Sequence, residues 1–304
     1  MRRYGVAVAA VGVLALASGC GSSSSSDDAA VVEARGTAEG AGAVLARASE
    51  STSAVETGRI RVVYRYTGDA DGEAIDAGMT AEGSFADFGK SMELTADMTP
   101  MIDAMGGGGF GGPESMVMRQ IIVDTDLYLQ MEMTPPVPEM PPGQWFRMDM
   151  SDALGGAGAG SVGGLGGMSG GPNGYLESLK AGGATVVEAG TDEIDGVPVT
   201  VYRGKLDPED AVAAADPETA DEVRRAFRES GMGTIPFTAF VDDDGMVRRL
   251  DMEMTMELYG LSMTVHMVMD LYDFGAPITV TPPPADQVVD EGFFGTAFEE
   301  LGTA

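Results

Sequence analysis

A chain of 304 residues with a formal net charge of −30 is long enough for one large β-rich domain or two ordinary domains. This acidity excludes nucleic acid as a partner, because a phosphate backbone would be repelled, and it excludes a basic patch for anionic lipid surfaces. We interpret it as a solubility feature. The single cysteine, Cys20, excludes an intramolecular disulfide and a cysteine-rich metal centre.

Residues 1–19 have the pattern of an export signal. Two arginines follow Met1, residues 6–16 form an apolar run, and small residues precede Cys20. The segment Leu16-Ala17-Ser18-Gly19-Cys20 resembles the bacterial lipobox, with Ala17 where that motif most often has leucine. The resemblance implies that Cys20 is the lipid-attachment residue. An ordinary signal peptide with an incidental cysteine is the alternative, and the arginine pair leaves Sec and twin-arginine export both open.

Residues 20–36 are rich in serine, glycine and aspartate, which is typical of a flexible tether. The apolar run before them is too short for a membrane-spanning helix. We therefore expect a domain held by its N-terminal lipid on the extracytoplasmic face of the cell membrane.

The pattern from residue 29 to about 56 is alanine-rich with apolar residues at helical spacing, which predicts a helix. The period then changes to two. This alternation predicts strands over residues 59–66, 79–88, 90–98, 116–125, 127–133 and 144–150, with an acidic turn at 68–78 and a proline-rich connector at 134–143. Strands with one polar and one apolar side indicate an antiparallel sheet with one solvated face.

Two glycine-rich runs, 105–113 and 155–174, interrupt this pattern. Glycine has no side chain to bury, and neither run has the Lys-Ser/Thr of a P-loop or the strand-then-helix frame of a dinucleotide site. We expect both to be mobile loops between strands.

The second half of the chain begins with a short helix at 173–180 and a strand pair over 184–206. An acid followed by proline then starts two helices, at Asp207 and at Asp216. Three strands follow, at 235–241, 250–258 and 261–271, and the acidic turn 242–245 lacks the spacing of a calcium loop. The order predicts an α+β domain over residues 37–285, with one large, strongly curved antiparallel sheet and helices laid against it, and an acidic tail at 286–304.

The last two strands carry methionine at most positions of one parity, and earlier strands repeat the pattern. Methionine is flexible and polarizable, so a methionine-rich face adapts to varied apolar guests. We predict an apolar ligand cavity lined by Met92, Leu94, Leu127, Leu129, Met131, Phe146, Met148, Met252, Met254, Met256, Met263, Val265, Met267 and Met269. The same face could instead be an ordinary core between sheet and helices, and the sequence leaves both interpretations open.

Several segments between residues 41 and 283 together resemble the LppX/LprG-type lipoproteins of actinobacteria. They are Gly-Arg-Ile-Arg-Val-Val-Tyr at 58–64, Asp-Leu-Tyr-Leu at 126–129, Gln-Trp-Phe-Arg-Met at 144–148, Ile-Asp-Gly-Val-Pro-Val-Thr-Val-Tyr-Arg-Gly at 194–204 and Asp-Gly-Met-Val-Arg-Arg-Leu at 244–250. The resemblance implies a half-open β-barrel, related to the LolA/LolB carriers, with helices over its concave face. It also implies binding of an acylated lipid and its transport in the cell envelope. The glycine-rich runs are not part of that pattern.

The sequence gives no support for catalytic activity. His266 is the only histidine and lies on the polar side of its strand, and no serine sits in a Gly-x-Ser-x-Gly elbow. We therefore expect no enzymatic activity, no metal and no cofactor. The expected partners are the membrane, an acylated lipid and an envelope transport partner. The alternative is an envelope protein-interaction or sensor-accessory lipoprotein with a filled core and no ligand.

Overall fold

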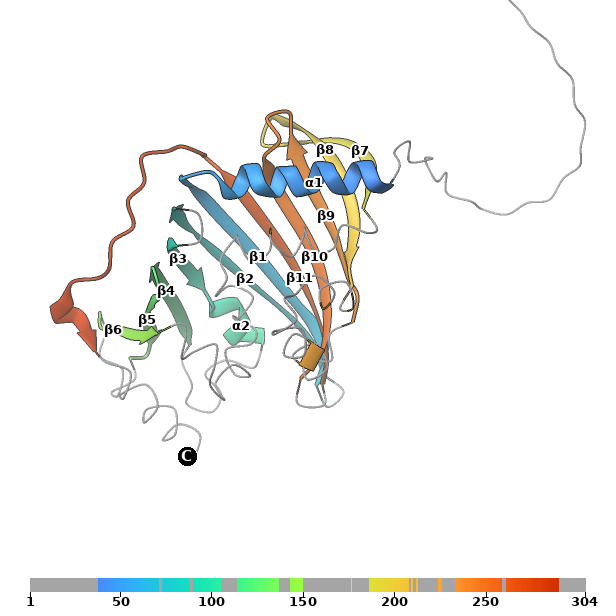
Figure 1. Ribbon diagram of the computed structural model, residues 1–304. Helices are drawn as coiled ribbons and strands as arrows, with labels where there is room; N and C mark the ends of the chain where they lie inside the picture. The colour runs from blue at the N-terminus through green and yellow to red at the C-terminus, as the bar shows by residue number, and fades with distance from the viewer. Residues whose placement is uncertain are drawn as a thin grey trace, which may run out of the picture. The chain divides into compact units, whose positions relative to one another are not determined.

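The computed structural model describes residues 38–70, 73–87, 90–104, 114–136, 143–149, 176, 186–207, 209, 212, 224–225, 233–258 and 261–289 (Figure 1). The predicted signal peptide, Cys20, the tether and both glycine-rich runs lie outside these residues. Most residues of the helices predicted after residue 172 also lie outside the described chain. The described positions 176, 209, 212, 224 and 225 are helical.

A single sheet dominates the described chain. Its strands are β1 (Thr57–Ala70), β2 (Glu73–Ala86), β3 (Ser91–Asp97), β4 (Ser115–Val123), β5 (Asp126–Thr134), β6 (Trp145–Asp149), β7 (Val187–Ile194), β8 (Val197–Leu206), β9 (Ile235–Asp242), β10 (Val247–Leu258), β11 (Leu261–Tyr272) and β12 (Val288–Val289). These strands follow the predicted ones in order, because period-two alternation is a direct signal of the extended chain.

The strand order is β12-β6-β5-β4-β3-β2-β1-β11-β10-β9-β8-β7. Each described pairing is antiparallel except β12 with β6, which is parallel. Because β12 and β7 stand at opposite ends of this order, the curved sheet is a half-open barrel. The predicted α+β class with one large antiparallel sheet is confirmed.

The centre of the sheet joins the two ends of the chain. β1 pairs with β11 from Arg59↔Tyr272 to Gly68↔Met263, and on its other side it pairs with β2 along its whole length. The methionine-rich strands β10 and β11 thus lie near the middle of the sheet, where elements from either half of the chain can cover one of their faces.

Helix α1 (Ala38–Ser53) crosses the sheet and contacts β7, β9 and β10 (Figure 1). Its buried side chains recur at helical spacing, with Ala41, Leu45, Ala48 and Thr52 on one side. The prediction of a helix over 29–56 is thus met for 38–53; residues 29–37 lie outside the described chain.

A second helix, α2 (Thr99–Ala104), contacts β2 and β4 and was not predicted. Asp97 lies two residues before its first residue, and the Asp97 carboxylate accepts a hydrogen bond from the backbone N–H of Thr99 at 3.0 Å. Hydrogen bonds from Thr99 lower the pKa of Asp97. The short 3₁₀ helix η3 (Ala285–Gln287) precedes β12.

Two expected boundaries differ from the structure. The acidic turn predicted at 68–78 is wrong, since β1 runs to Ala70, β2 begins at Glu73, and Thr67 pairs with Asp76. The reason is cross-strand charge pairing: Arg65 donates two hydrogen bonds to the Asp76 carboxylate, at 2.9 and 2.7 Å. At the other boundary, the segment expected to be the tail begins with η3 and β12, which pairs with β6.

Glycines give this sheet room to curve. Gly58 pairs with Phe85, and Gly204 pairs with Phe237, so each aromatic ring lies over a glycine on the neighbouring strand. A Cβ at Gly58 would lie 2.5 Å from Cζ of Phe85. Rings that cover glycines in this way stabilise curved sheets, because the ring fills the space that a side chain would occupy.

Candidate functional site

One face of the sheet, which we call the inner face, carries the methionines. Directly paired residues of antiparallel strands project to the same side, so the register traces continuous rows. One row runs Met252, Met267, Tyr64, Met79 across β10, β11, β1 and β2, and the next runs Leu250, Met269, Val62, Ala81, Ala96, Met118, Met131 to β5. The inner face is therefore shared by β1–β5, β10 and β11.

The structure places the predicted cavity residues on this face. Their side chains differ in how far they are buried. Met92, Leu94, Leu127, Phe146, Met252, Val265, Met267 and Met269 are buried; Leu129, Met131, Met148, Met254 and Met263 are partly exposed. Met256 pairs with Met263 in the register, but its side chain lies outside what the structure describes.

Most of these side chains belong to one apolar cluster that also contains Leu45 of α1 and Leu176. Phe146 and Met263 are not part of it, and Phe146 packs with Met131, Met133 and Val289 in a second, smaller cluster. The inner face is thus a filled core under α1, where Leu45 and Met267 are both 0% exposed.

The inner face is less completely covered toward the turn between β10 and β11. Along β10 burial falls from Leu250 and Met252 to the partly exposed Met254, and along β11 it falls from Val265 to Met263. Coverage is also incomplete over β5 and β6, at Leu129, Met131 and Met148. Apolar side chains on an inward face that remain partly exposed are available to a further apolar group.

Sequence reasoning missed several inner-face residues. They are Ile60, Val62 and Tyr64 of β1, Met79 and Ala81 of β2, Phe237 and Ala239 of β9, and Tyr202 of β8, all buried in the main cluster. For β1, the alternation of apolar and polar residues over 60–66 already indicated which side chains share a face. For β9 and Tyr202 only the register reveals the shared face.

A single amide interrupts the apolar wall over β3 to β6. The inner-face positions of these strands are Met92, Leu94, Ala96, Met116, Met118, Gln120, Ile122, Leu127, Leu129, Met131, Met133, Phe146 and Met148. Gln120 is the one polar side chain in this set and is 7% exposed.

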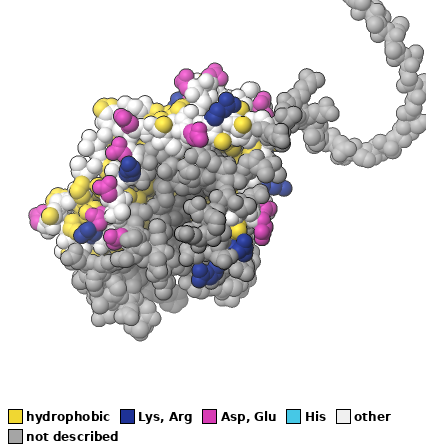
Figure 2. Space-filling view, viewed as in Figure 1, with side chains coloured by type: hydrophobic (Ala, Val, Ile, Leu, Met, Phe, Trp, Pro, Cys, Tyr) yellow, Lys and Arg dark blue, Asp and Glu magenta, His cyan; other side chains and the backbone are white. Residues whose placement is uncertain are grey.

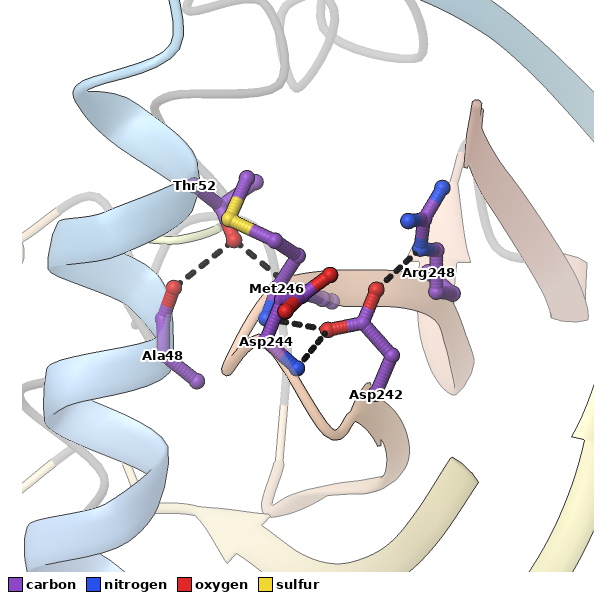
Figure 3. Close-up of polar contacts among 7 residues, drawn as sticks. Ala48, Thr52, Asp242, Asp244, Met246 and Arg248 are labelled. Atoms are coloured by element: carbon purple, nitrogen blue, oxygen red, sulfur yellow. Dashed lines mark hydrogen bonds and ion pairs between the residues drawn. The ribbon is translucent and has the colours of Figure 1, made fainter. Parts of the chain in front are cut away.

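Helix α1 is fixed to the sheet by a buried hydroxyl (Figure 3). Thr52 donates to the carbonyl oxygen of Ala48 at 2.7 Å and accepts from the backbone N–H of Val247 at 2.8 Å. The adjacent turn is held by Asp242, whose carboxylate accepts from the N–H of Met246 at 2.8 Å and pairs with Arg248. The end of α1 is thereby tied to the start of β10.

The opposite face of the sheet, which we call the outer face, is charged. Asp270 lies between Arg61 and Arg249 on the two neighbouring strands and accepts hydrogen bonds from both. These hydrogen bonds raise the pKa of each arginine. His266, the one histidine, bonds to Asp251 at 2.8 Å on this same face, so it lies away from the inner face.

Among the described residues, no set of three or more His, Cys, Asp or Glu side chains is placed to hold a metal ion. The acidic turn 242–245 is a structural turn in which Asp242 binds backbone N–H groups. No described helix is long and apolar enough to cross a membrane. On the side of the molecule shown in Figure 2, the described acidic and basic side chains are interspersed with apolar ones.

Comparison with solved structures returns matches of low sequence identity. LprF from Mycobacterium bovis matches with a TM-score of 0.40 and 14% identity, covering 81% of this chain and 98% of that one. LppX from Mycobacterium tuberculosis matches with a TM-score of 0.43 and 13% identity, covering 80% and 98%. A LolA superfamily protein from Nitrosomonas europaea matches with a TM-score of 0.25 and 12% identity, covering 81% and 96%.

LppX is also one of the two proteins after which the resembled lipoprotein group is named. No protein-family model and no curated protein sequence matches this chain.

Proposed function

We propose that this chain is a membrane-anchored, extracytoplasmic lipoprotein that binds an acylated lipid or a similar apolar ligand against the inner face and carries it in the cell envelope. The observation that supports this is the incomplete cover of the inner face. Met254 and Met263 at one end, and Leu129 and Met131 over β5, are apolar, inward-facing and partly exposed.

The physical chemistry of these side chains suits a lipid that must later be released. Methionine has three rotatable side-chain bonds and a polarizable sulfur, so a methionine wall fits acyl chains of varied shape. Each buried CH₂ contributes about 0.8 kcal/mol. Several methylene groups therefore suffice for binding, without the many fixed contacts that would slow release.

The proposed organisation has four parts. Residues 1–19 are the signal peptide, Cys20 carries the lipid, and residues 20–36 form the tether. Residues 37–285 form the lipid-binding half-barrel, and the acidic segment 286–304 follows, of which β12 pairs with β6. The tether would hold the inner face close to a membrane that contains candidate ligands, and an envelope transport partner would load or unload them.

Lipid extraction tests the proposal. The full chain carrying Cys20→Ser, which removes the proposed attachment site, is purified from cells and extracted with organic solvent. We expect acylated lipid in stoichiometric amount and uptake of a solvatochromic dye. A clean extract together with no dye uptake would overturn the proposal.

A matched pair of variants on β10 assigns the binding to the inner face. Met254→Glu places a charge on the partly exposed part of the inner face and should abolish dye uptake, since an acyl chain cannot solvate a carboxylate. Thr255→Glu places the same charge at the next residue, which is exposed on the outer face, and should leave uptake unchanged. Equal uptake by both variants would refute the assignment of the wall.

A second function is supported by the complete burial of Met267 and Met269. If the whole face is packed in the same way, the chain is an envelope protein-interaction or sensor-accessory lipoprotein without a ligand. The extraction separates the two functions, because this alternative requires an extract free of lipid.

A further inference from the structure

Gln120 lies in the middle of β4 with apolar side chains on every side of it. Its partners in the register are Leu94 on β3 and Leu129 on β5, and its same-face neighbours along β4 are Met118 and Ile122. All four belong to or pack against the main apolar cluster. At 7% exposure the side chain is more than nine-tenths buried, so an amide sits inside an otherwise hydrocarbon wall.

This amide has hydrogen-bonding capacity that the described chain does not use. A glutamine side chain offers two N–H donors and one carbonyl acceptor. No hydrogen bond joins the Gln120 side chain to any residue that the structure describes, whereas the outer-face glutamine of β5, Gln130, accepts one from Arg119 at 3.5 Å. The amide atoms of Gln120 are not among the fully buried side-chain atoms that lack a partner in the described chain, so they keep some exposure. An apolar ligand that covers them must supply a partner, because a buried polar group without one costs free energy.

The surroundings determine which partner fits. The inner-face positions of β3 to β6 carry no charged side chain in the described chain, so a phosphate or a free carboxylate would find no cation there. A neutral acceptor flanked by hydrocarbon on both sides suits the amide N–H of Gln120 in this apolar wall. An ester carbonyl, which joins an acyl chain to its alcohol, has that character.

We propose that Gln120 is the specificity residue of the lipid site: its side-chain N–H donates a hydrogen bond to the ester carbonyl of the bound acyl lipid and fixes the ligand's position along the wall. This inference rests on the proposed lipid-binding function and names its ligand class as a neutral acyl ester. Binding sites of this kind combine an apolar lining with a few polar groups that set orientation. A site that presents a buried donor discriminates against an analogue that lacks the acceptor, because the donor is then left unpaired.

The experiment compares two probes that differ only in having or lacking ester carbonyls. A diacylglycerol and the dialkyl ether of the same chain length are titrated into the full chain carrying Cys20→Ser. We expect the ester to bind about tenfold more tightly, which is the effect of one hydrogen bond to a buried donor. Gln120→Leu and the volume-conserving Gln120→Met should bring the two affinities to within about twofold.

The control is Gln130→Leu, which removes a glutamine from the outer face of the adjacent strand and should keep the tenfold preference. Equal binding of the two probes by the unsubstituted Gln120 protein overturns the inference and leaves the proposed function standing; this comparison requires no variant to fold. A tenfold preference that persists in folded Gln120→Leu or Gln120→Met also overturns it. Binding of neither probe refutes the proposed lipid binding itself, and the inference with it.

Discussion

The inner and outer faces of the sheet are made by the same strands but are held together by different forces. On the outer face, oppositely charged residues of neighbouring strands form pairs such as Arg65–Asp76, Arg119–Glu132 and Arg147–Asp126. Exposed pairs of this kind contribute between about 0 and 1 kcal/mol, because water solvates the separated charges almost as well. The outer face thus favours the correct register and solubility more than it stabilises the fold.

The inner face contributes through burial. A fully buried methionine, leucine or phenylalanine side chain contributes about 1.5–3 kcal/mol, and the rows around Met252 and Met267 contain many of them. The comparison shows that this chain concentrates its stability on the face that we also propose for ligand binding. A methionine-rich composition fits both roles, since the same flexible side chain fills a core and adapts to a guest.

Asp270 is the exception on the outer face. Its side chain is only 6% exposed, between Arg61 and Arg249. Two charge-assisted interactions compensate for the loss of its hydration. This three-strand bridge lies across β1, β11 and β10, directly behind the row that contains Met269, so the outer face is most strongly held where the inner core is deepest.

The largest expected difference between the faces concerns a buried charge. Met267→Glu places a carboxylate at a position that is 0% exposed, opposite Tyr64 and Met252, with no cation in its row. We expect a loss of roughly 4 kcal/mol in the free energy of unfolding, measured by urea denaturation.

Val63→Glu is the matched control on the adjacent strand. Val63 is 38% exposed on the outer face between Arg61 and Arg65, so its substitution should change the free energy of unfolding by less than about 0.5 kcal/mol. A similar loss in both variants would contradict the division of the sheet into two faces.

Substitution of glycines in β2 is expected to give the next largest change in the free energy of unfolding. Gly83 pairs with Ile60 and Leu94 on the inner-face parity, and a Cβ there would overlap the backbone carbonyl of Glu93. Gly83→Ala must therefore push β2 and β3 apart and should cost about 2–3 kcal/mol. Gly78, on the outer-face parity of the same strand, would place a Cβ 3.7 Å from its nearest atom, the carbonyl oxygen of Tyr64.

Gly78→Ala is therefore expected to be neutral or to stabilise by up to about 1 kcal/mol, because alanine lowers the entropy of the unfolded chain. The two variants are compared by their urea midpoints. If Gly83→Ala were tolerated as well as Gly78→Ala, the close approach of β2 and β3 would not be a constraint on this sheet.

The sequence predicted the face of most strand residues, because alternation with period two determines on which side of a sheet a side chain projects. For this reason it put Met252, Met267 and Met269 on one parity, and the register places them on one face of the sheet. It could not predict that β1 pairs with β11, since the two strands are separated by some 190 residues of chain and alternation does not specify a partner. The degree of cover at Met254 and Met267 was also out of reach, because it depends on where α1 crosses the sheet.

Two local signals were present in the sequence but were not recognised. Asp97 followed by Thr99 and Pro100 is a helix start, and it opens the six-residue α2. Gln120 stands between Met118 and Ile122 at the apolar parity of its strand, so its inward position follows from alternation alone. Its lack of a partner in the described chain, which gives it functional interest, required the structure.

The smallest expected effect concerns the helix that covers the inner face. Thr52→Val keeps the volume of the side chain but removes the acceptor for the buried N–H of Val247, so we expect a loss of about 1–2 kcal/mol and faster hydrogen exchange at that amide. Ser49→Ala is the control on the same helix: Ser49 is equally buried, yet its hydroxyl makes no hydrogen bond in the described structure, so its removal should be neutral or slightly stabilising. If both variants lost the same stability, α1 would be held by packing alone, and the hydrogen bond from Val247 to Thr52 would not contribute to covering the inner face.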